Sequence, residues 1–204
     1  MFAKRVICLS ILVSLSNIPM LALAREIGDT QMPPLAEKFR PSESDAISKE
    51  IKVFSNVRIS ARDAIAIAEK RSRGAKVVDV SFDGEADQLA YRVKTYWHNE
   101  IWIGVIDALT GMIVGDGIVT PLSMLDMKDR TALARFRTAG IDLSDATKIA
   151  EQYGSGKAVS AGLEEENGKL SFLVVIVKDG SLKQISIDPN EGERPRRNSS
   201  IGRK

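Results

Sequence analysis

Residues 59–69, ISARDAIAIAE, and residues 141–151, IDLSDATKIAE, are two versions of one segment. Further along the chain the likeness keeps its register, apart from a one-residue deletion. Similarity that holds register over such a length indicates an internal duplication, which predicts a repeated fold. The matched positions are Asp63/Asp145, Ala64/Ala146, Ile67/Ile149, Ala68/Ala150, Glu69/Glu151, Gly74/Gly156, Leu89/Leu170, Val93/Val174 and Ile106-Asp107/Ile187-Asp188.

Each unit begins with the pattern of a capped helix and continues with the pattern of strands. Ser60 is a favoured N-cap residue, and Asp63 suits the third helical position of a capping box. Gly74 is placed to end the helix, and Asp179-Gly180 predicts a type I′ hairpin in the second unit. β-branched runs separated by turn residues predict strands over 76–82, 89–97, 101–109 and 112–114, and again over 158–164, 169–178 and 181–188.

These patterns predict an α+β fold with two repeated modules. Each module is a helix packed on a three- to four-stranded antiparallel sheet, and extra helices connect the modules. A leading helix is expected over 44–54 and a connector helix over 121–139. The predicted segments are a signal peptide (1–24), a flexible N-terminal segment (25–42), the first module with its leading helix (43–118), the connector with the second module (119–188) and a disordered basic tail (189–204).

The N-terminus has the pattern of a secretory signal. Lys4 and Arg5 precede an apolar stretch, and Ala22-Leu23-Ala24 is a small-residue cleavage site. Cleavage after Ala24 would release the protein into the periplasm or the medium, whereas a retained signal would anchor it in the membrane. Cleavage also removes Cys8, the only cysteine, and both basic residues. The mature chain is then formally neutral and free of thiols, so neither a disulfide nor a nucleic-acid partner is indicated.

The repeated unit resembles the PepSY domain. The first copy carries I-S-x-x-x-A-I-x-I-A from Ile59, G-x-K-V-V from Gly74, L-x-Y-x-V from Leu89 and I-D-A-x-T-G from Ile106. The second copy keeps D-A-x-x-I-A-E from Asp145 and I-D-x-x-x-G from Ile187, but it lacks the Ala-Thr-Gly ending.

This resemblance implies a helix on an antiparallel sheet and a binding role. PepSY domains occur in propeptides of secreted thermolysin-type metallopeptidases, where a restraining role is proposed. They also occur alone or in tandem in bacterial envelope proteins. The family has no invariant catalytic set, so the resemblance transfers no functional residue to this chain.

The residues themselves predict no catalytic, cofactor-binding or metal-binding site. His98, the only histidine, aligns with Asp179 of the hairpin turn and is expected at a hairpin tip. Asp63 and Asp145 suit helix starts, and Glu164-Glu165-Glu166 suits a solvated turn. A less favoured alternative is that the protein binds a metal ion through carboxylates from separate parts of the chain.

The strands of both units are apolar on two faces, although one helix can cover only one of them. The second face is covered either within the monomer, by the other sheet or the connector helix, or by a docking protein or second copy. The leading hypothesis is therefore a non-catalytic periplasmic module that acts by protein–protein contact and restrains a secreted peptidase. The alternative is a self-associating envelope protein, with membrane contact at most through the basic tail. The candidate partner-binding residues are Tyr96, Ile101, Ile103, Leu173, Val175, Val177 and Leu182.

Overall fold

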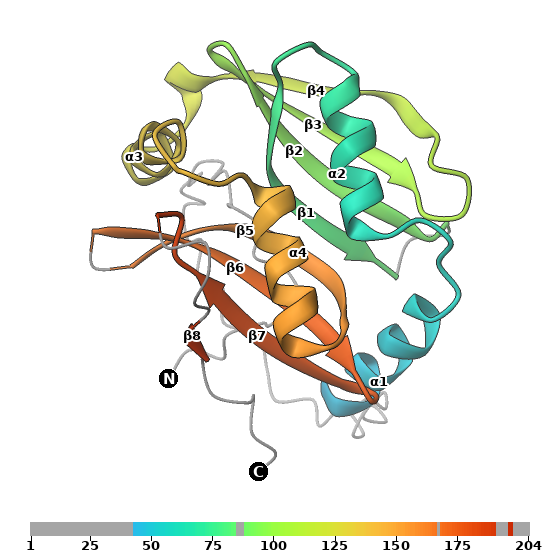
Figure 1. The fold of residues 1–204 in the computed structure, drawn as a ribbon. Coiled ribbons are helices and arrows are strands. Elements are labelled where there is room, and N and C mark those ends of the chain that lie inside the picture. Colours follow the sequence, from blue (N-terminus) through green and yellow to red (C-terminus); the bar gives the residue numbers. More distant parts are fainter. Residues whose placement is uncertain (1–42, 85–87, 167, 191–195, 198–204) are drawn as a thin grey trace, which may run out of the picture.

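A computed structural model describes residues 43–84, 88–166, 168–190 and 196–197 (Figure 1). The predicted signal peptide, the N-terminal segment 25–42 and most of the basic tail lie outside the described residues. Within them, both repeats have the predicted order of one long helix followed by antiparallel strands. The first repeat contains α1 (Glu43–Phe54), α2 (Ala61–Lys70), β1 (Lys76–Asp83), β2 (Ala90–Trp97), β3 (Glu100–Asp107) and β4 (Ile113–Pro121).

The second repeat follows the same plan after a short connector. Asp179 and Gly180 both have positive φ (49° and 69°), as a type I′ turn requires. The turn pairs Val177 with Leu182, as the sequence predicted. Its elements are a 3-10 turn (Leu122–Met124), α3 (Met127–Phe136), α4 (Leu143–Gly154), β5 (Lys157–Glu166), β6 (Lys169–Lys178), β7 (Ser181–Ile187) and the two-residue β8 (Arg196–Arg197).

The two repeats share one continuous antiparallel sheet in the order β4-β3-β2-β1-β5-β6-β7-β8. They meet where β1 pairs with β5, with Asp79 opposite Gly162, Val80 opposite Ala161 and Ser81 opposite Ser160. The alternative in which one sheet covers the second face of the other is therefore wrong. The repeats are joined edge to edge, and backbone hydrogen bonds connect them.

Helices α2 and α4 lie side by side on one face of this sheet (Figure 1). Helix α2 begins at the predicted cap, and α4 begins at a corresponding one. Ser60 and Asp63 form a reciprocal capping box, with Asp63 N donating to Ser60 Oγ at 3.1 Å, and Asp142 Oδ1 accepts from Asp145 N at 3.0 Å. Each helix buries mainly small residues and one large aliphatic residue, and the small residues allow close packing. These buried residues are Ala61, Ala64, Ile65 and Ala68 in α2, and Leu143, Ala146, Thr147 and Ala150 in α4.

The repeated glutamate at the end of each helix ties that helix to its first strand. Glu69 Oε1 accepts from Val77 N at 3.2 Å, and Glu151 Oε1 accepts from Ala158 N at 3.0 Å. Burial raises the pKa of Glu69, and the bond from Val77 N and the charge of Lys76 partly oppose this shift. The D-A-x-x-I-A-E pattern therefore carries a structural carboxylate in both copies.

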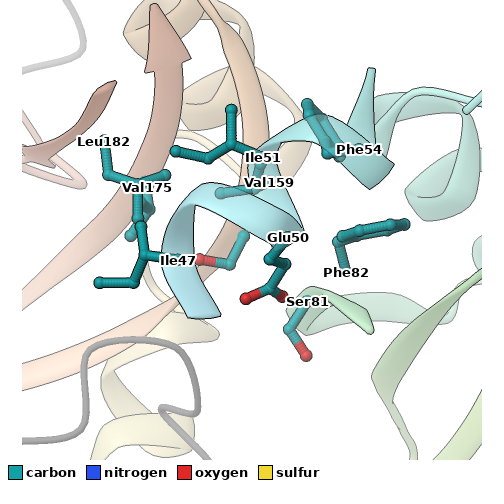
Figure 2. A pocket seen from close by; sticks show the side chains of 10 residues that line it. Ile47, Glu50, Ile51, Phe54, Ser81, Phe82, Val159, Val175 and Leu182 are labelled. Carbon is teal, nitrogen blue, oxygen red and sulfur yellow. The ribbon is translucent and has the colours of Figure 1, made fainter. Parts of the chain in front are cut away.

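The opposite face of the second repeat is covered by α1, the leading helix of the first repeat (Figure 2). Ile47 and Ile51 point toward Val159, Val175 and Leu182 around a cavity of about 30 Å³. Such a cavity has room for roughly one water molecule, so the contact is nearly close-packed. Cover within the monomer therefore exists on this face of the second repeat, and the leading helix of the other repeat supplies part of it. The connector helix α3 also packs against β5 and β6.

Two boundaries differ from the sequence prediction. The strand expected over 112–114 extends to Pro121, because the β-branched run Ile118-Val119-Thr120 favours extended backbone. The connector helix consequently starts later, at Met127, where Asp126 accepts from Asp129 N at 2.7 Å as an N-cap.

Removing the cap of α2 should destabilise the fold. Ser60→Ala leaves the amide of Asp63 without its acceptor, so the free energy of unfolding should fall by about 1 kcal/mol. Urea unfolding followed by circular dichroism measures this change. Ser60→Asn keeps an acceptor at the N-cap and is the matched control, and an equal loss in both variants would contradict the capping role.

Candidate functional site

Strand β4 forms one end of the sheet and leaves a backbone edge open. Its inner side pairs with β3 through Trp102/Val119, Ile103/Ile118 and Val105/Val114. In the described part of the chain, no strand pairs with its outer side. An open edge presents N–H and C=O groups that can hydrogen-bond to another extended chain. β4 is therefore the candidate binding edge.

A glycine-rich bulge divides β4 into two halves. Gly115 and Gly117 have positive φ (68° and 73°), and residues 115–117 together oppose the single residue Gly104. The indole of Trp102 holds the bulge, because its Nε1 donates to Asp116 O at 2.9 Å. A Cβ on Gly117 would lie 2.4 Å from that nitrogen, so only glycine fits. The half after the bulge, 118–120, stays in regular pairing with β3.

Apolar side chains are exposed along this edge. Ile118 and Val119 point to opposite faces of the sheet and are 65% and 51% exposed. Among the described residues, almost every large exposed apolar side chain lies on β4 or on segments next to it, and the exception is Tyr153 on α4. Such concentration marks an interaction site more often than scattered apolar residues do. The residues near β4 are Trp97, Leu109, Met112, Val114, Ile118, Val119, Met124 and Met127.

The strand at the other end of the sheet, β8, is much shorter than β4 and is charged. β8 has only two residues, both arginines, and pairs through Ile185/Arg197 and Ser186/Arg196. Short, charged end strands discourage pairing with another chain. The nine-residue β4, whose only charge is Asp116 in the bulge, has neither protection.

The partner-binding residues predicted from the sequence share one face of the continuous sheet, but none of them is exposed. Ile101, Leu173 and Val175 are buried, and Val175 and Leu182 line the cavity under α1. Tyr96, Ile103, Val177 and Leu182 are half-buried. Ile103 alone pairs with an exposed residue of β4, Ile118, and so borders the open edge. That edge was missed because the last predicted strand of the first module ended at residue 114, although three consecutive β-branched residues at 118–120 were a signal for a strand.

The side chains that could have served in catalysis or metal binding have roles in turns and hairpins. His98 lies at the β2–β3 hairpin tip with φ of 53°, and its ring stacks on Trp97 at 4.2 Å. Asp107 accepts from Leu109 N and from the amide and hydroxyl of Thr110, which lowers its pKa, because these bonds favour the charged form. Across the described ranges, no group of three or more His, Cys, Asp or Glu side chains is arranged to hold a metal ion. No helix there is long and apolar enough to cross a bilayer.

A charged cluster lies at the junction between the repeats. Asp79 on β1 is opposite Lys94 on β2 and Gly162 on β5, and a Cβ on Gly162 would lie 2.9 Å from Asp79 Oδ2. Burial raises the pKa of Asp79 to about 6, although Lys94 opposes this shift. Burial also raises the pKa of Asp129 on α3, which Lys94 opposes as well. Lys94 therefore lies between two partly desolvated carboxylates from different elements.

Comparison with known proteins places the chain in a family. Residues 58–116 and 140–193 match the family model described as "Peptidase propeptide and YPEB domain" (PepSY). The two matches span more than half of the 204 residues, so the chain belongs to the PepSY family, as the sequence patterns indicated. Among solved structures, the chain is similar to a protein from Clostridium difficile 630 that is provisionally described as a lipoprotein. The identity is 20%, the match covers 73% of this chain and 99% of that one, and the TM-score is 0.41. No curated protein sequence matches the chain.

The raised pKa of Asp79 predicts a pH dependence of stability. The folded protein holds this proton up to about pH 6, whereas the unfolded chain releases it near pH 4. Protonated Asp79 therefore contributes about 2–3 kcal/mol to the free energy of unfolding below pH 4, and this contribution is lost as the pH rises through 6. Relative to wild type, Asp79→Asn should therefore gain stability by this amount between pH 4 and pH 7.

Urea unfolding of both proteins at a series of pH values measures this difference. Asp179→Asn is the control, because this exposed aspartate lies in a turn that asparagine also favours. A constant difference between Asp79→Asn and wild type across the range would show that Asp79 does not titrate in the folded state as expected.

Proposed function

We propose that this protein is a non-catalytic module of the cell envelope that acts by binding another protein along β4. The observation that carries the proposal is the open edge of β4 together with the exposed apolar residues on both of its faces. In strand addition, backbone hydrogen bonds supply affinity and alternate side chains supply specificity. Ile118 and Val119 would contact the added strand on opposite faces of the sheet.

The chemistry of the edge indicates an extended, apolar partner segment. The regular half of β4 carries no charge, so an added strand with β-branched or aromatic residues would make favourable cross-strand pairs. The bulge at 115–117 would limit regular pairing to the half after it, because the bulge interrupts the ladder. The proposed contact is therefore short, and a transient regulatory complex fits it better than a permanent one.

Membership of the PepSY family supports a secreted peptidase as the partner. In this finer version of the proposal, the module binds an extended segment of the peptidase and restrains its activity. The predicted signal at 1–24 would deliver the module to the same compartment. Non-catalytic action is supported by the structural use of Glu69, Glu151 and Asp107 described above.

Charge on the open edge should prevent partner binding. Ile118→Lys places an ammonium beside the apolar side chains that an added strand would bring to that face, and the native fold should be kept because the side chain is already exposed. Affinity should fall at least about tenfold, which corresponds to about 1.4 kcal/mol. The measurement is inhibition of thermolysin-type peptidases co-secreted with the protein, together with capture of partners from periplasmic extract.

Tyr153→Lys is the matched control, since it adds the same charge at an exposed apolar residue far from β4 in the sequence. If wild type slows no peptidase, the restraining version is wrong. If Ile118→Lys and Tyr153→Lys capture the same partners equally well, β4 is not the binding edge.

The same edge supports self-association as a second candidate function. Antiparallel edge-to-edge pairing already joins β1 to β5 within the chain, and β4 of a second copy would offer an identical edge. Sedimentation equilibrium should then show a dimer for wild type and a monomer for Ile118→Lys. A stable wild-type monomer over the whole concentration range would remove this candidate and leave a different protein as the partner.

A further inference from the structure

An approximate two-fold axis relates the two repeats and passes through the centre of the β1–β5 junction. Each first strand has a bulge directly before Asp79 or Ser160, which makes these two residues equivalent. The junction pairs each of its positions with the same position of the other repeat, as a two-fold axis requires. The second face of the sheet can therefore be compared residue by residue between the repeats. The pairs around the axis are Asp79/Gly162, Val80/Ala161 and Ser81/Ser160.

The same axis relates the two leading helices, α1 and α3. Phe54 of α1 and Phe136 of α3 are equally far in sequence from the N-caps of α2 and α4. Each packs edge-on against an aromatic ring of its own repeat, with ring centroids 5.1 Å apart for Phe82 and 6.0 Å apart for Phe172. Ahead of its phenylalanine, each helix extends toward the other repeat: α1 toward β6, and α3 toward β2.

The side chains at these crossings differ between the two helices. In α1, Ile47 points toward Val175 on β6, and Ser160 lines the same cavity (Figure 2). An apolar contact in the second repeat is thus replaced by three charged groups in the first. The corresponding residues near α3 are Asp129, Lys94 and Asp79.

These three charges are costly where they lie. Asp79 and Asp129 are both partly removed from water. Lys94 Nζ is buried and has no hydrogen-bond partner among the described residues. Buried charges that lack hydrogen bonds destabilise a fold relative to apolar side chains of similar size. The second repeat shows that apolar side chains fit this arrangement, so the charges indicate a function rather than a requirement of packing.

The cluster has one ammonium, Lys94, for two carboxylates. Burial raises the pKa of Asp79 to about 6, so this side chain takes up a proton in mildly acidic solution. Lys94 then compensates Asp129 alone, and the cluster becomes neutral. Docking of α3 brings Asp129 to the cluster and removes water from Asp79, so protonation of Asp79 favours docking.

The charged groups around the cluster leave Asp79 as the one that changes its charge. Strand β5 presents the neutral Gly162 and Ser160 to β1. On α3, the charges of Asp126 and Lys128 act on Asp129 with opposite signs. The other charged groups near β1 on this face are Glu50 on α1, which lies beside Ser81, and Arg92 on β2, which binds Asp83 at 2.8 Å.

We propose that Asp79, Lys94 and Asp129 form a pH-sensitive latch that holds α3 on the first repeat more tightly in acid than at neutral pH. Because α3 follows β4 through only the 3-10 turn, the latch also fixes the end of the open edge. For that edge the inference rests on the proposed function, whereas the docking of α3 can be measured without any partner.

Hydrogen–deuterium exchange of the whole protein, read by mass spectrometry, measures how firmly each helix is docked. Protection factors are compared at about pH 5 and about pH 7.5, after correction for the pH dependence of intrinsic exchange. Peptides from α3 should be about tenfold more protected at the lower pH, because docked Asp79 holds its proton up to about pH 6 and exposed Asp79 releases it near pH 4. Peptides from α1, whose contact is apolar, are the internal control and should change much less.

Two variants and a control test the cluster itself. Asp79→Asn removes the titrating group, so α3 should be equally protected at both pH values. A triple variant, Asp79→Ser with Lys94→Val and Asp129→Ile, copies the contact of the second repeat and should also hold α3 equally at both. Asp179→Asn, in an exposed turn, should behave as wild type.

Three results would overturn the inference. The first is equal protection of α3 at both pH values in wild type, and the second is a pH dependence that survives in Asp79→Asn. The third is an equal change in α1 and α3, which would show an effect on global stability instead of a latch. None of these results depends on whether a partner binds β4, so the latch can fail while the proposed function stands.

Discussion

The backbone pairing of β1 with β5 is the interaction on which the rest of the structure depends. It joins two duplicated units into a single sheet, so α2 and α4 come to lie on the same face and pack against each other. The join is local, with three residue pairs, and it has a steric requirement at its centre. Gly162 leaves the space that the carboxylate of Asp79 occupies, and a larger residue there would push against it. A buried charge at this junction is tolerated because Lys94 faces it from β2.

Edge-to-edge joining decides which surfaces are left to bind other molecules. Two sheets stacked face to face would have covered each other, whereas one broad sheet needs helices on both faces. On the second face, α1 from the first repeat covers strands of the second, so each repeat depends on the other for its core. The inner edges β1 and β5 are used in the join. Of the two outer edges, β8 is short and basic in sequence, and β4 is long and apolar.

Local features were predictable from the sequence, and features that depend on distant contacts were not. The capping box of Ser60 and Asp63 and the Asp179-Gly180 turn depend on neighbouring residues, and both are present. The apolar second face was also recognised, but the helix that covers Val175 precedes it by more than a hundred residues in the chain. No periodicity in α1 or β6 specifies that contact. The end of β4 was missed as well, because the glycines of the bulge interrupt the strand pattern between residue 114 and the β-branched run at 118–120.

The duplication explains how the first repeat can keep an open edge. Corresponding positions differ in size: Ile176 and Ile185 fill the core of the second repeat, whereas the first repeat has Thr95 at one position and Gly104, covered by the Trp102 ring, at the other. Because the two units share one sheet, the well-packed second repeat stabilises the first. The open edge of β4 belongs to the first repeat, so the second repeat can stabilise the shared sheet while the first carries the edge proposed to bind a partner.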